Sequence, residues 1–298
     1  MTAPAGLGLA LAPAADLASV SLGDPVPDAV RPVPGAGSGR RTGGDASRFA
    51  LADREAAAAW RADGQAVADA APSSGRPGAP TAENASRPLA IGGLSKLSTC
   101  DWPGKLAATV FLQGCPWNCL YCHNPDLIDP RAPGSLDWAD VLAFLRGRVG
   151  LLDAVVFSGG EATRQELGPA IAQVRELGFL VGLHTSGAYP RRLAALLDKV
   201  DWVGFDVKAL PDNLPQVTGV AASAAAMAES LRLLLASGVD CQVRTTWGPG
   251  VPTVATPAQA EAVLDWARAQ GVSAPVLQPV RAEGARPAFR SARAAAIS

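Results

Sequence analysis

The chain has 298 residues, a pI near 6.1 and a net charge of -1 at neutral pH, which suits one or two domains with a sizeable core. The near-neutral charge offers no electrostatic footprint for nucleic acid, and no run of about 18 uncharged apolar residues occurs, so we predict neither nucleic-acid binding nor a membrane span. The five cysteines are an odd number, which argues against a disulfide framework and favours a reducing, cytoplasmic compartment with thiols available for metal binding or catalysis.

Residues 1–89 differ in composition from the rest of the chain. They are rich in Pro, Gly, Ser and Ala, they contain few aromatic residues, and the first lysine of the chain is Lys96. Such a segment buries too little apolar surface to offset its conformational entropy, so we predict a largely disordered extension with at most one helix. We assign the core domain to residues 90–281 and a flexible tail to residues 282–298.

From residue 89 onward, short apolar runs alternate with amphipathic segments. The apolar runs predict six buried strands, near residues 106–114, 152–160, 179–183, 202–207, 239–246 and 274–280. Apolar stripes at helical spacing, or strong helix formers, predict helices near residues 135–148, 164–178, 190–200, 224–238 and 256–271. Gly178 and Gly238 are expected C-caps, and Thr256 with Pro257 is expected to open the last helix. This alternation predicts a parallel α/β sheet covered by helices, either a partial barrel or a doubly wound open sheet.

Three of the five cysteines, Cys115, Cys119 and Cys122, lie within eight residues directly after the strand predicted at 106–114. Active sites of parallel α/β folds lie at the carboxyl ends of the strands, so this loop is well placed for one. Thiolates at Cys-x3-Cys-x2-Cys spacing can converge on one metal centre, and three thiolates on a four-iron cluster leave one iron open for chemistry. The alternative is a structural zinc site completed by His123, although adjacent residues rarely bind one ion and zinc sites usually use spaced Cys pairs.

This cysteine loop resembles the cluster-binding loop of the radical S-adenosylmethionine (SAM) superfamily, and the resemblance extends over residues 91–281. It implies a partial (β/α)6 barrel in which the three cysteines hold a [4Fe–4S] cluster. It also implies that the amino and carboxylate groups of SAM chelate the open iron, and that reduction of the cluster cleaves SAM to a 5′-deoxyadenosyl radical.

Two motifs at later strand ends support the resemblance. Gly159, Gly160 and Glu161 look like the Gly-Gly-Glu segment that meets the methionyl amino group of SAM; glycines permit close backbone approach, and a carboxylate accepts from an ammonium. Asp206 and Lys208 lie on the same side of a strand end because side chains alternate with period 2. Their Asp-x-Lys pattern resembles the glycyl-radical activating enzymes and implies that Lys208 pairs with the SAM carboxylate while Asp206 orients the site. Taken singly, the Gly-Gly-Glu motif is also compatible with a turn that exposes its Glu, and the Asp-x-Lys motif with an ordinary ion pair at a strand end.

The resemblance alone assigns further residues to the cofactor pocket. Tyr121 is in the place of an aromatic residue that flanks adenine, His123 belongs to the sequence YCHNP that is typical of activating enzymes, and Arg244 precedes a similar Pro-Gly turn. Two positions depart from the family pattern. His184 replaces an Asp, so this position has no acid. His184 could contact a ligand or could be a histidine packed in the core, and both alternatives stay open. Arg281 replaces a ribose-contacting His, so the adenosine end of the pocket is expected to differ.

The upstream sequence IGGLSKLSTCDWPGKLAATVFLQGC, with no second cysteine cluster in the chain, resembles the activating proteins of anaerobic ribonucleoside-triphosphate reductases. The resemblance implies an activase that makes a glycyl radical on a partner enzyme and takes electrons from a flavodoxin- or ferredoxin-type reductant. One alternative is a small-molecule radical SAM enzyme such as 7-carboxy-7-deazaguanine synthase. Another, from a different class, is a non-catalytic iron–sulfur or zinc-binding protein, which would not need both later motifs.

Overall fold

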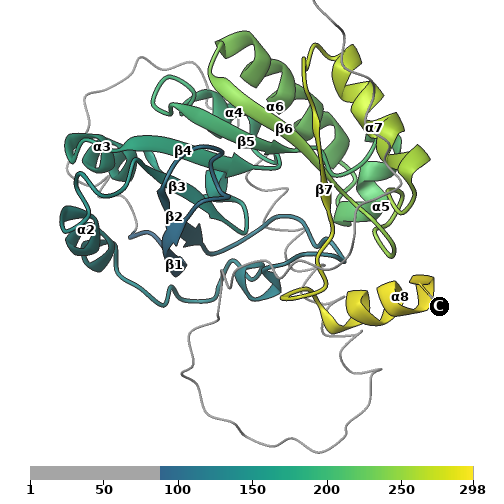
Figure 1. Ribbon diagram of the computed structural model, residues 1–298, viewed down its shortest axis with the longest axis horizontal. Coiled ribbons are helices and arrows are strands. Elements are labelled where there is room, and N and C mark those ends of the chain that lie inside the picture. Colours follow the sequence, from purple (N-terminus) through teal and green to yellow (C-terminus); the bar gives the residue numbers. More distant parts are fainter. Residues whose placement is uncertain (1–87, 298) are drawn as a thin grey trace, which may run out of the picture. The chain divides into compact units, whose positions relative to one another are not determined.

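The computed structural model describes residues 88–297, which belong to one compact unit (Figure 1). The strands are β1 Ile91–Ser98, β2 Ala107–Leu112, β3 Ala154–Gly159, β4 Leu180–Thr185, β5 Trp202–Asp206, β6 Asp240–Trp247 and β7 Val276–Pro279. The α-helices are α2 Trp138–Arg146, α3 Gly168–Glu176, α4 Pro190–Ala194, α5 Leu214–Thr218, α6 Ser223–Ser237, α7 Pro257–Ala269 and α8 Pro287–Ile297. Three 3-10 turns are η1 Pro125–Leu127, η2 Ala162–Arg164 and η3 Pro211–Asn213. Apart from its last two residues, the extension predicted over 1–89 lies outside the described residues.

The seven strands form one sheet in chain order, β1 to β7. Strands β2 to β7 are parallel to their neighbours, and β1 pairs antiparallel with β2. A doubly wound sheet reverses its strand order at a switch point, which this sheet does not do, so that alternative is wrong. Within the described residues no pairing joins β1 to β7. The six parallel strands with their crossover helices therefore confirm the predicted partial (β/α)6 barrel.

The two faces of the sheet carry different side chains because residues alternate along each strand. The outer face is apolar and buried under the helices; its residues include Val110, Leu112, Phe157, Leu183, Phe205 and Val243. The inner face carries small and polar residues, which include Thr109, Ser158, Gly182, His184, Asp206 and Arg244. Burying each large outer-face side chain contributes roughly 1.5–3 kcal/mol, so the outer face stabilises the fold and leaves the inner face free for chemistry.

The amino ends of the strands are closed by two tryptophans on the inner face. The rings of Trp102 and Trp202 stack with their centroids 5.3 Å apart, in one buried cluster with Ala107 and Ala154 at the starts of β2 and β3. A Cβ on Gly182 would lie 2.9 Å from the Trp102 ring, so glycine makes room for this stack. A ligand on the inner face must therefore lie toward the carboxyl ends.

The expected helix ends agree with the structure at two places. Thr256 opens α7 with a capping box, in which its hydroxyl accepts from the backbone N–H of Gln259. Gly238 ends α6 in the left-handed conformation, with φ of 71°. Among the described helices none alone has the length and hydropathy of a membrane span, although α5 with η3 and α6 together, a pair bent by 119°, meets both criteria.

Two segments differ from the prediction. The sequence analysis places no strand before residue 106, yet β1 is present. Its glycines and polar residues show no apolar pattern that predicts a strand, and β1 is stabilised by its antiparallel pairing with β2. It also places a flexible tail over residues 282–298, where the structure has helix α8. Phe289 is the fully buried residue of this helix, and a single large apolar residue does not make the repeating pattern by which an amphipathic helix is predicted.

Candidate cofactor-binding site

The cysteine loop, residues 114–124, follows β2 at the carboxyl end of the sheet. The backbone N–H groups of Gly114 and Cys115 donate to the carbonyl groups at the end of η1, at 2.8 and 3.0 Å. The backbone N–H of Asn118 donates to the carbonyl oxygen of Thr218, the last residue of α5, at 2.9 Å. The loop backbone is therefore attached both to the segment that follows it and to a helix distant in sequence.

Burial opposes the ionisation of two thiols of this loop, Cys115 and Cys119. Burial raises the pKa of Cys115 well above its ordinary value, and the neighbouring charges of Cys119 and Glu161 raise it further. Burial also raises the pKa of Cys119 to about 11, although Lys208 acts in the opposite direction. In the described part of the chain no three His, Cys, Asp or Glu side chains are arranged to hold one metal ion as they stand. Metal binding therefore requires the thiols to lose protons and turn toward a common point.

The donor set of the loop fits a [4Fe–4S] cluster held by three thiolates. His123, the alternative fourth zinc ligand, has its Nε2 3.0 Å from the carbonyl oxygen of Arg281, so this nitrogen carries the proton and donates it. The ring is thus tied to the C-terminal segment. Tyr121 is 3% exposed, and its hydroxyl is buried with no hydrogen-bond partner among the described residues. Buried hydroxyls normally have partners, so a polar ligand beside Tyr121 would satisfy this group.

Gly159 and Gly160 bring the end of β3 against the cysteine loop. A Cβ on Gly159, whose φ is 120°, would lie 2.2 Å from the backbone nitrogen of Leu112. A Cβ on Gly160 would lie 2.5 Å from the carbonyl oxygen of Gly114. The glycines are therefore required by a contact between two backbone segments, and this contact positions the loop. Their predicted approach to SAM stays a prediction.

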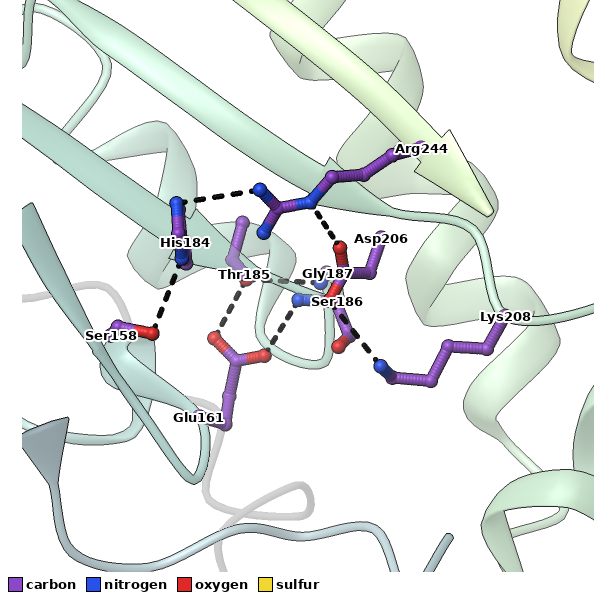
Figure 2. A network of polar contacts seen from close by, with 9 residues as sticks. All are labelled: Ser158, Glu161, His184, Thr185, Ser186, Gly187, Asp206, Lys208 and Arg244. Carbon is purple, nitrogen blue, oxygen red and sulfur yellow. Dashed lines mark hydrogen bonds and ion pairs between the residues drawn. The ribbon is translucent and has the colours of Figure 1, made fainter. Parts of the chain in front are cut away.

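Glu161 joins the ends of β3 and β4 (Figure 2). Its side chain is buried, and its Oε1 accepts from the hydroxyls of Thr163 and Thr185, each at 2.6 Å. Its Oε2 accepts from the backbone N–H of Ser186 at 2.9 Å. The structure thus gives Glu161 a positioning role that the sequence did not predict. The predicted contact with the methionyl ammonium would have to use the remaining capacity of Oε2.

Asp206 is held between two cations, as Figure 2 shows. The Nε of Arg244 donates to its Oδ1 at 2.7 Å, and the Nζ of Lys208 lies 3.4 Å from its Oδ2. Burial opposes the charge of Asp206, but Arg244 and Lys208 hold its pKa well below the ordinary range. Burial likewise opposes the charge of Lys208, but Asp206 and then Tyr121 raise its pKa above the ordinary range. Asp206 and Lys208 are therefore both charged at neutral pH.

Lys208 and Arg244 differ in what they can offer a ligand. The ammonium of Lys208 makes one contact with Asp206 and lies 6.0 Å from the centre of the Tyr121 ring, beside the cysteine loop. An ammonium has three donors, so Lys208 has capacity left for an anion. Arg244 is 7% exposed and its guanidinium donates to Asp206, so its charge is used to hold this carboxylate. Its predicted contact with the cofactor is not tested by this geometry.

His184 is packed in the inner face as a neutral ring. Its Nε2 lies 2.7 Å from the carbonyl oxygen of Asp101 and therefore donates, while its Nδ1, 3.3 Å from the Ser158 hydroxyl, accepts. Burial lowers the pKa of His184 to about 4, and Arg244 contributes to this. A Cβ on Gly204 would lie 2.8 Å from the ring, so glycine makes room for it. The structure supports the packed-histidine interpretation.

The sequence analysis missed the residues that hold the predicted ones in place. Thr163 and Thr185 supply the donors to Glu161, and Ser158 and Asp101 fix the tautomer of His184. Thr185 follows His184 at the end of β4, and this polar pair after four nonpolar residues is the one signal that the sequence offered.

Comparisons with known proteins agree on the family. The model of the radical SAM superfamily matches residues 109–269. A Methanocaldococcus jannaschii protein, MJ1227, named as a glycyl-radical enzyme activating enzyme, is 34% identical over 126 residues, which cover 40% of this chain and 50% of that protein. The pyruvate formate-lyase-activating enzyme of Clostridium pasteurianum is 30% identical over 129 residues, covering 41% of this chain and 54% of that enzyme. The chain thus spans about half the length of the curated relatives it matches.

Among solved structures, QueE from Escherichia coli aligns with a TM-score of 0.36 and 16% identity, over 65% of this chain and 94% of that chain.

Proposed function

Since the chain belongs to the radical SAM superfamily, we propose that it is an activase that makes a glycyl radical on an anaerobic ribonucleoside-triphosphate reductase. The observation that carries the proposal is the position of Lys208, whose Nζ lies 3.4 Å from Asp206 and 6.0 Å from the centre of the Tyr121 ring in the cysteine loop. The relatives named as activating enzymes support the activase class. The reductase as partner rests on the sequence resemblance before and within the cysteine loop.

The residues of this chain divide the work. When bound, the [4Fe–4S] cluster and SAM that the family implies supply a 5′-deoxyadenosyl radical able to abstract hydrogen from a glycine. Cys115, Cys119 and Cys122 would hold the cluster, and Lys208 would bind the SAM carboxylate as a charged donor. Tyr121, which is buried beside Lys208, would help to exclude water from the bound cofactors.

An open sheet suits a protein substrate. Strands β1 and β7 are not paired with each other within the described residues, so the inner face is not enclosed by a complete ring of strands. A loop of a partner enzyme can approach the carboxyl end through such an opening, whereas a closed barrel admits ligands only from its ends. This feature supports a macromolecular substrate.

Electron paramagnetic resonance tests the proposal. The anaerobically reconstituted chain is mixed with SAM, dithionite and an anaerobic ribonucleoside-triphosphate reductase, and we expect a glycyl-radical doublet. A reductase whose radical-bearing glycine is replaced by alanine is the matched control and should give no doublet. Cleavage of SAM with no doublet on the reductase would contradict the proposed partner, and a doublet on another glycyl-radical enzyme instead would keep the activase class while replacing the partner.

A further inference from the structure

Gln113, which links the end of β2 to the cysteine loop, holds the start of that loop to the segment that follows it. Its side chain is buried, and its amide nitrogen donates to the carbonyl oxygens of Asp126 and Asp129, each at 2.9 Å. Both carbonyl groups come after Cys122, the third cysteine of the loop. A side-chain amide has two N–H donors, so Gln113 uses both of them on this segment.

A second glutamine, Gln165, holds the backbone of Gln113 in place. The amide nitrogen of Gln165 donates to the carbonyl oxygens of Gln113 and Ala90, each at 2.9 Å. Its amide oxygen accepts from the backbone N–H of Ala90 at 2.9 Å, and the carbonyl oxygen of Ala90 also accepts from the backbone N–H of Gln113 at 2.8 Å. We call Gln113 and Gln165 the glutamine clasp. It connects the end of β2, the end of η2 and the residue before β1.

The glutamine clasp closes the segment that carries the three adjacent thiols. The three cysteines of the loop all lie between Gln113 and Asp126 in the chain, so the bonds of Gln113 join the two ends of this segment. Bringing the ends of a loop together costs conformational entropy, and a loop that is closed before its ligand arrives does not lose this entropy on binding. A glutamate would present only acceptor oxygens to the two carbonyl groups, so this role requires a side chain with donors.

We propose that Gln113 is a positioning residue for the metal centre: its two bonds keep the cysteine loop closed and lower the cost of bringing the three thiolates to one point. The proposal rests on the proposed function, which needs this metal centre, and it adds a residue that the resemblance did not assign. Gln113 acts without touching the metal, through the backbone that carries the thiolates. Gln165 acts one step further away, through the backbone of Gln113.

Release of iron to a chelator tests this role. The full chain is reconstituted anaerobically, and its loss of iron to excess EDTA is followed by the bleaching of the cluster absorbance. Gln113→Met keeps the approximate length of the side chain but removes both donors, so we expect release to be at least about tenfold faster. Gln113→Glu should release iron at least as fast as Gln113→Met. Gln165→Met should have a smaller effect in the same direction, because both bonds of Gln113 to the later segment remain.

A control at the opposite end of the sheet separates positioning from stability. Asp201 accepts from the backbone N–H of Val181, near the start of β4, at 2.7 Å, so Asp201→Ala removes a hydrogen bond away from the cysteine loop. This variant should have a lower free energy of unfolding but should release iron at the parent rate, with the parent electron paramagnetic resonance spectrum of the reduced centre. In Gln113→Met that spectrum should broaden, because the thiolates adopt more than one arrangement.

Hydrogen exchange in the chain without metal gives an independent readout. The backbone N–H groups of Gly114 and Cys115 donate to the carbonyl oxygens of Leu127 and Ile128, in the segment that Gln113 holds. These two N–H groups should therefore exchange at least about tenfold faster in Gln113→Met than in the parent chain.

Iron release in Gln113→Met at the parent rate, or equally fast release in Asp201→Ala, would overturn the proposal. If the parent chain took up no iron, the proposed function would be contradicted instead. The exchange rates of Gly114 and Cys115 would then decide whether Gln113 closes the loop, and unchanged rates in Gln113→Met would show that it does not.

Discussion

The cysteine loop and the polar network at the carboxyl ends of the strands differ in how far their polar groups are satisfied. The polar network consists of Glu161, His184, Asp206 and Arg244 with their partners, and each of these side chains has hydrogen-bonding partners within 2.9 Å. The cysteine loop contains the buried Tyr121 hydroxyl, without a partner among the described residues, and thiols whose pKa burial raises. The network is preformed, whereas the loop has donors that only a ligand would satisfy.

This difference explains how one sheet can combine rigidity with cofactor binding. The network joins β3 to β4 and β5 to β6, so it fixes the ends of four strands before any ligand arrives. The loop can then change its side-chain positions on a frame that stays constant. Substitutions in the loop should therefore abolish function and spare stability, while substitutions in the network should lower the free energy of unfolding.

The largest expected effect is loss of the metal centre in the loop. Cys119→Ala removes one of three thiolates, and we expect iron content to fall from about four per chain to a small fraction of that, with no cleavage of SAM. The free energy of unfolding without metal should change little. Iron and acid-labile sulfide analysis checks this, and Cys100→Ala, at an exposed cysteine outside the loop, is the matched control. Full iron loading in Cys119→Ala would remove it from the ligand set.

Glu161→Gln should instead destabilise the fold. The amide offers one acceptor oxygen in place of two, so either the threonine hydroxyls or the backbone N–H of Ser186 lose their partner in a buried place. We expect the free energy of unfolding to fall by about 2–3 kcal/mol, measured by urea titration followed by circular dichroism. Glu166→Gln, at an exposed position, should stay within about 0.5 kcal/mol of the parent chain. An equally small change in Glu161→Gln would mean that the carboxylate does not join the strands.

Lys208→Met should weaken SAM binding and leave the fold intact, because Asp206 keeps its bond to Arg244. Loss of a hydrogen bond to a charged group costs about 1.5–3 kcal/mol, which predicts roughly 10- to 100-fold weaker binding. Isothermal titration of the reconstituted protein with SAM measures this, with Lys199→Met on the outer surface as the control. An unchanged dissociation constant would show that Lys208 serves only Asp206.

The smallest expected effect is a pH dependence from the network. Burial lowers the pKa of His184 from 6.5 to about 4, so between these values the unfolded chain binds the proton more readily. The stability due to neutral His184 is complete above pH 6.5 and is lost as the pH falls toward 4. We expect the free energy of unfolding to fall by about 1–2 kcal/mol between pH 7 and pH 5.

The variant His184→Gln isolates this contribution, because an amide can still donate to the Asp101 carbonyl but does not titrate. Burial also lowers the pKa of His123, so part of the pH dependence should persist in the variant. If the two unfolding curves changed equally with pH, His184 would not be the titrating group.

The sequence predicted those parts of the molecule whose signals are local. The six parallel strands, the N-cap of α7 at Thr256 and the three closely spaced cysteines all depend on residues within a few positions of one another. The partners of Glu161 were not predicted, because Thr185 lies 24 residues away and only the parallel pairing of β3 with β4 brings them together. Strand β1 and helix α8 were missed for the same reason, since each is stabilised by contacts with distant residues.

Product analysis after reduction tests the central claim most directly. The full chain is reconstituted anaerobically with iron and sulfide, reduced with dithionite and given SAM. If the cysteine loop and Lys208 together form a radical SAM site, 5′-deoxyadenosine and methionine will appear in equal amounts. A chain that binds zinc in place of iron and returns SAM unchanged would contradict the account.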